Sequence, residues 1–198
     1  MKRLAITIAL FLSLPAGAAP IGPSGSDPAG GGPAAGEVEG YVSAGIPVVC
    51  AGVDRGFGRT ILGLEASILV LGVLRPELHA RWPFHPGEFT LTPRVAVAFS
   101  IPLRGEFSDG PTIHTLELAP GLVFARAIGQ FTPFLDVGML GLSSLFLKTQ
   151  TRFFATTTAG LRWAVTEQVA LGAHVGWLYT ERRAAPAVGL TVSVNFSR

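Results

Sequence analysis

The sequence predicts an all-β protein that crosses a membrane as a closed antiparallel β-barrel of eight strands. Long segments alternate between apolar and non-apolar residues with a period of two, which is typical of strands. Their non-apolar faces carry mainly Gly, Ala, Ser and Thr, which suits a crowded barrel interior better than a surface in water. Charged residues make up only 14% of the chain, against about a quarter in an average soluble domain.

The first 18 residues are predicted to be a signal peptide. Lys2 and Arg3 precede an apolar run over residues 4–14, and Ala16-Gly17-Ala18 then supplies the small residues that a signal peptidase accepts. We expect cleavage after Ala18. A membrane anchor is the alternative, but the run is shorter than the about 20 residues that a spanning helix needs.

Residues 19–36 are almost entirely Pro, Gly, Ala and Ser, and we interpret them as a flexible leader. Residues 37–198 then form one domain. Without Lys2 and Arg3, the 15 basic residues fall to 13, which equals the 13 acidic residues. The mature protein is therefore formally neutral, and its charge gives no reason to expect a nucleic-acid partner.

The expected strands follow one another along the body in chain order. Residues 37–48 supply the first, and residues 60–84 keep one phase throughout, so they are either one long strand or two strands joined near 72–76. Clearer alternation covers residues 89–101, 114–126, 131–142, 153–165, 169–179 and 187–196. This gives eight or nine candidates, and because barrels of this class close with an even number of strands, we predict eight.

A soluble sandwich or a lipocalin-like barrel would show the same alternation, but its outer face should carry Lys, Glu, Gln and Asn. Lys148 is the only Lys after the leader. Short connections at 85–88, 127–130 and 166–168 alternate with longer ones at 102–112, 143–152 and 181–186. Membrane barrels show this pattern, with short periplasmic turns and long external loops.

The last strand has the sequence Gly189-Leu190-Thr191-Val192-Ser193-Val194-Asn195-Phe196. With the exported start and the strand pattern from about 37 to 196, it resembles the small bacterial outer-membrane β-barrels of the OmpA/OmpX type. That family usually ends on the aromatic residue, whereas Ser197 and Arg198 follow Phe196 here. The resemblance implies a monomer in the lipid bilayer of the cell outer membrane, which the barrel-assembly machinery recognises through its last strand.

Alternation also places charged residues inside the barrel. An interior of eight strands is only wide enough for side chains, and buried charges must pair because an isolated buried ion is very costly. We therefore expect an ion-pair network that plugs the lumen, with Glu77, His79 and Arg81 as further candidates. The predicted members are Glu65, Arg94, Glu117, Asp136, Arg162 and His174.

Signals for catalysis or cofactor binding are weak, and we expect no catalytic residue, cofactor or metal. Alternation puts His114 and Glu117 on opposite faces, and two spaced histidines such as His79 and His174 are a poor metal signal. Cys50 lies in an apolar run and fits an apolar filler better than a reactive thiol. The alternative function is a barrel-embedded lipid-modifying enzyme, which needs a nucleophile, a base and an orienting acid at one rim.

Overall fold

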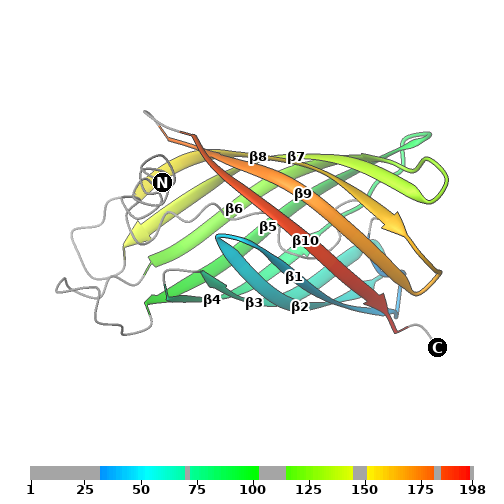
Figure 1. Cartoon of the computed structure of the whole chain (residues 1–198), viewed down its shortest axis with the longest axis horizontal. Coiled ribbons are helices and arrows are strands. Elements are labelled where there is room, and N and C mark those ends of the chain that lie inside the picture. The colour runs from blue at the N-terminus through cyan, green and yellow to red at the C-terminus, as the bar shows by residue number, and fades with distance from the viewer. Residues whose placement is uncertain (1–31, 70–71, 103–114, 145–150, 181–183, 197–198) are drawn as a thin grey trace, which may run out of the picture.

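The structure, a computed structural model, describes residues 32–69, 72–102, 115–144, 151–180 and 184–196. Its ten strands form a closed barrel in which each strand pairs antiparallel with its chain neighbours, and β1 closes against β10 (Figure 1). The strands are β1 Val38–Ile46, β2 Val48–Phe57, β3 Thr60–Leu69, β4 Val73–Arg81, β5 Phe89–Pro102, β6 Thr115–Arg126, β7 Phe131–Ser144, β8 Thr151–Ala164, β9 Val169–Tyr179 and β10 Ala184–Asn195. The predicted closed antiparallel barrel is confirmed.

The predicted count of eight strands is wrong, for two reasons. A single residue, Pro47, connects β1 to β2, so no turn signature separates them, and two glycines and the adjacent pair Asp54-Arg55 hide the alternation of β2. Residues 60–84 contain two strands, β3 and β4. Odd-numbered residues point inward on both strands. The alternation therefore continues from β3 to β4 and does not show that two strands are present.

The barrel is apolar outside and polar inside. Large apolar side chains such as Val42, Leu64 and Leu190 are 56%, 60% and 67% exposed on the outer wall, whereas inward carboxylates such as Asp54 and Glu77 are almost fully buried. A barrel in water has the opposite arrangement, so these faces are those of a membrane-spanning barrel. None of the described residues forms a helix long and apolar enough to cross a membrane.

Both described chain ends lie at one end of the barrel, which we call the terminal end (Figure 1). The Phe196 N–H donates to the Val38 carbonyl oxygen at 2.8 Å and so joins them directly. Exposed aromatic side chains gather at this end, and Trp163 stacks on Phe131 with ring centroids 6.1 Å apart. Such a belt marks the interface between hydrocarbon and lipid headgroups. Its members are Phe57, Phe84, Phe89, Phe124, Phe131, Trp163 and Phe196.

Residues 33–36, predicted to end a flexible leader, pack against the terminal end of the barrel. Ala35 forms a parallel bridge with Gly56. Glu37 accepts hydrogen bonds from the Asn195 amide at 2.9 Å and the Ala34 N–H at 3.1 Å, and these bonds hold the pKa of its carboxyl below the usual value. The folded body thus begins before the predicted boundary at residue 37. The predicted signal peptide and the earlier part of the leader lie outside the described residues.

Candidate functional site

A chain of alternating charges lies inside the barrel along β2 and β4. Arg81 pairs with Asp54 Oδ2, and Asp54 Oδ1 lies 2.8 Å from His79 Nε2. The other ring nitrogen of His79 lies 3.3 Å from Glu77 Oε1. Four side chains that alternate in sign along this path are therefore in contact.

Arg75 connects this path of charges to β6. Its Nη2 lies 2.6 Å from Glu77 Oε2, and its Nε donates to Glu117 Oε2 at 2.7 Å. The Ser100 hydroxyl on β5 donates to the other oxygen of Glu117. We call the six ionisable residues of this path the charge chain: Arg81, Asp54, His79, Glu77, Arg75 and Glu117.

Water is almost excluded from the charge chain. Every side chain in it is at most 4% exposed, so the charges must be balanced by one another. Both ring nitrogens of His79 face carboxylate oxygens, which only accept hydrogen bonds. This contact suits the imidazolium, and with His79 protonated the chain has three positive and three negative charges.

Glycines let polar side chains meet across an intervening strand. Asp54 on β2, Gly63 on β3 and His79 on β4 share one row of the sheet. A Cβ at Gly63 would lie 1.9 Å from Asp54 Oδ1 and 2.1 Å from His79 Nε2. The absence of a side chain at Gly63 is thus what allows the Asp54–His79 contact.

A glycine lies beneath two further polar contacts in the barrel, although in the second of them Asp136 lies two residues along β7 from the row of Gly121. The Tyr41 hydroxyl passes over Gly52 and donates to Glu65 Oε2 at 3.2 Å. The Arg94 guanidinium lies over Gly121, and its Nη2 reaches Asp136 Oδ2 at 2.7 Å. The inward polar residues of β1 to β7 therefore form several crossings, each built on a glycine.

The predicted lumen residues all face inward, and several of them make ion pairs or hydrogen bonds. Glu117 belongs to the charge chain, Arg94 and Asp136 pair separately, and Glu65 contacts Tyr41. Arg162 and His174 lie on neighbouring rows of β8 and β9. The His174 ring packs over Gly189 of β10, where a Cβ would lie 2.6 Å from it.

The predicted network left out four polar members of these contacts: Tyr41, Asp54, Arg75 and Ser100. Asp54 was missed because β2 itself was missed. The inward residues of β2 are Cys50, Gly52, Asp54 and Gly56, and they alternate with mostly larger outward residues. This alternation could have indicated the strand. The Cys50 side chain is buried.

Apolar side chains fill the lumen beside the polar contacts. One buried cluster packs Phe154 against six inward residues: Ala96, Ala119, Leu140, Leu142, Leu178 and Ala185. A second cluster contains Val123, Ala125 and Phe134. Leu178 and Val123 are both 0% exposed, so water does not reach these parts of the lumen.

A histidine and a hydroxyl do meet at the rim of the terminal end. His85 Nδ1 lies 3.1 Å from Thr90 Oγ1, but the neighbouring Glu88 pairs with Arg126. A carboxylate in contact with His85, which would orient it as a base, does not occur among the described residues. They also contain no group of three or more His, Cys, Asp or Glu side chains placed to hold a metal ion.

No family model and no curated protein matches the sequence. Among solved structures, the N-terminal β-barrel domain of Pseudomonas aeruginosa OprF is 13% identical, with a TM-score of 0.39 over 81% of this chain and 96% of that one. Yersinia pestis Ail is 12% identical, with a TM-score of 0.43 over 81% and 99%.

The outer-membrane enzyme PagL is 15% identical, with a TM-score of 0.39 over 82% of this chain and 99% of its own. At these identities the likeness is one of fold alone. The closed antiparallel barrel of the chain itself, with its apolar outer face and polar interior, is that of a protein that spans a membrane.

Proposed function

We propose that the protein is a monomeric β-barrel of the bacterial outer membrane with a lumen closed by side chains and a role without catalysis. That role is structural, or is exerted through the connections at the end opposite the terminal end. The even strand number, and the end that the start of β1 shares with the end of β10, support this location. The terminal end then faces the periplasm, and β10 is the strand that the barrel-assembly machinery reads.

The charge chain is the observation that best supports a lumen closed by side chains. It runs from β2 to β6 through side chains that are at most 4% exposed. A hydrated ion would have to separate these pairs and displace the apolar clusters beside them. Because breaking a buried ion pair costs several kcal/mol, the barrel should pass no steady ion current.

Planar-bilayer recording tests this closure. The wild-type protein should give no stable conductance, although heat-dependent migration on a gel shows that it is folded. A variant with small neutral residues at Arg75, Glu77 and Glu117 should conduct more often than the wild type, because it removes the centre of the charge chain. A large, steady current through the folded wild-type protein would contradict the closed lumen.

Lipid analysis tests the role without catalysis. The His85–Thr90 contact is the observation that favours the enzyme alternative, since a base next to a hydroxyl can activate it. Cells or vesicles with and without the protein should nevertheless contain the same lipid species by mass spectrometry. A change in acyl chains that disappears in a Thr90→Val variant would overturn the proposal in favour of an enzyme.

A further inference from the structure

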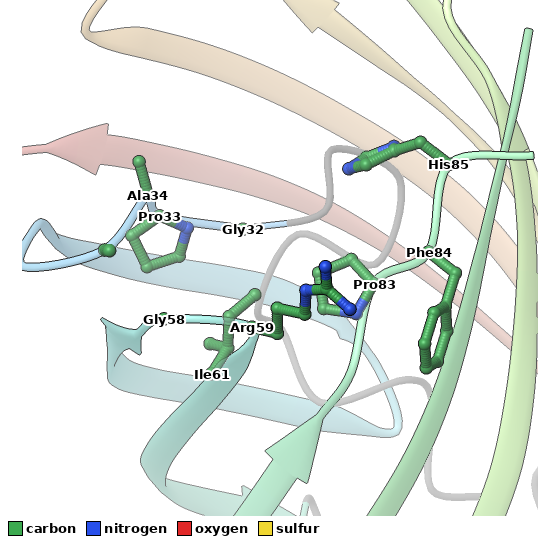
Figure 2. Close-up of a pocket in the computed structure, with 10 residues that line it drawn as sticks. Gly32, Pro33, Ala34, Gly58, Arg59, Ile61, Pro83, Phe84 and His85 are labelled. Atoms are coloured by element: carbon green, nitrogen blue, oxygen red, sulfur yellow. The ribbon is translucent and has the colours of Figure 1, made fainter. Parts of the chain in front are cut away.

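A pocket of about 580 Å³ opens at the terminal end of the barrel, next to the Arg81 end of the charge chain. Its walls come from residues 32–35, from the β2–β3 turn with Gly58 and Arg59, and from residues 83–85 after β4. Figure 2 shows the side chains of Arg59 and His85 in this space, each from a different segment. Three segments that are distant in sequence therefore build one cavity.

The pocket is positively charged. Its ten lining residues include Arg59 and His85 but no Asp or Glu. Arg59 is exposed and has no ion pair with any described residue, and the contact of His85 with Thr90 uses only Nδ1. The nearby carboxylate of Glu88 is engaged by Arg126. The guanidinium of Arg59 and Nε2 of His85 are thus available to an anion.

The pocket lies at the level of the aromatic belt. Phe84 lines the pocket and is 49% exposed. Phe57, at the end of β2, also belongs to the belt, and the Arg55 guanidinium lies over its ring, 5.3 Å from the ring centroid. Aromatic belts of membrane barrels lie at the depth of the lipid headgroups. Phosphate is the anion at that depth, and Phe84 offers exposed apolar surface beside Arg59 and His85.

We propose that this pocket binds a phosphate ester, supplied by the headgroup of an anionic phospholipid. Arg59 takes two phosphate oxygens with its planar guanidinium, a geometry that Arg matches well. His85 donates from Nε2 to a third oxygen, while its Nδ1 is held by Thr90. The glycerol part of the lipid then contacts Phe84.

Native mass spectrometry of the full chain in maltoside micelles tests this site, because maltosides contain no phosphate. The probes are phosphatidylglycerol and, in a separate arm, soluble glycerol 3-phosphate. The test variant combines Arg59→Gln with His85→Gln. A second variant, Arg59→Lys, keeps the positive charge but loses the planar guanidinium that binds two oxygens. Arg55→Gln is the matched control, an exposed Arg at the same end of the barrel that does not line the pocket.

We expect one retained phosphatidylglycerol on the wild type and on Arg55→Gln, and retention about tenfold weaker in the double variant, which corresponds to about 1.4 kcal/mol. Arg59→Lys should retain part of the binding. Equal binding of glycerol 3-phosphate would support the phosphate site but assign it to a soluble ester. If the double variant, folded by heat-dependent migration, retains both probes as well as the wild type, the proposal is wrong.

Discussion

Removal of Arg75 should destabilise the barrel more than removal of any exposed arginine. Arg75 lies between Glu77 and Glu117, 2.6 Å and 2.7 Å away, with its own side chain only 4% exposed. Arg75→Met keeps much of the side-chain volume but leaves two carboxylates buried without their shared cation. Breaking a buried pair in this way costs about 3–5 kcal/mol.

The matched control is Arg126→Met. Arg126 also pairs with a glutamate, Glu88, but these side chains are 47% and 74% exposed, and such surface pairs contribute about 0–1 kcal/mol. The free energy of unfolding would be measured by reversible urea unfolding in lipid vesicles, followed by the fluorescence of the three Trp residues.

A further variant separates lost charge balance from lost packing. Arg75→Met combined with Glu77→Gln and Glu117→Gln removes the stranded carboxylates, so much of the lost stability should return. If Arg75→Met costs no more than Arg126→Met, or if neutralising the two glutamates restores nothing, the charge chain does not stabilise the barrel as argued.

Two further predictions concern the lipid face and the glycine crossings. Leu190→Arg, at an outward site 67% exposed near the middle of β10, should cost about 2–4 kcal/mol in the vesicle assay, against about 0–1 kcal/mol for Ala184→Arg at the first residue of β10. Equal costs would contradict the membrane position. Gly63→Ala should cost about 1–3 kcal/mol, because its Cβ would lie 1.9 Å from Asp54 Oδ1, whereas Gly172→Ala, whose Cβ would meet nothing closer than 3.4 Å, should be tolerated. Similar unfolding midpoints for the two alanine variants would show that the Asp54–His79 contact does not need the gap.

The sequence predicted the barrel and its two faces because every strand must obey the same alternation to place apolar residues in lipid. The number of strands was not predicted correctly because it depends on recognising the turns. The one-residue connection at Pro47 gives almost no turn signal in the sequence. The alternation along a single strand is enough to predict that Glu117 and Asp136 point inward. Which partner each one meets depends on the register between strands, and no pattern within a single strand contains that information.

The polar crossings suggest how that register is chosen. A slip of one residue between strands turns every lipid-facing side chain inward and is strongly excluded. A slip of two residues preserves the alternation, so the apolar outer face alone does not oppose it. Such a slip between β3 and its neighbours would remove Gly63 from the row of Asp54 and His79 and put Glu65 or Ile61 there. The contact would then be blocked and two buried charges would lose their partners. The glycine crossings of β1 to β7 therefore penalise the alternative registers that the lipid face permits.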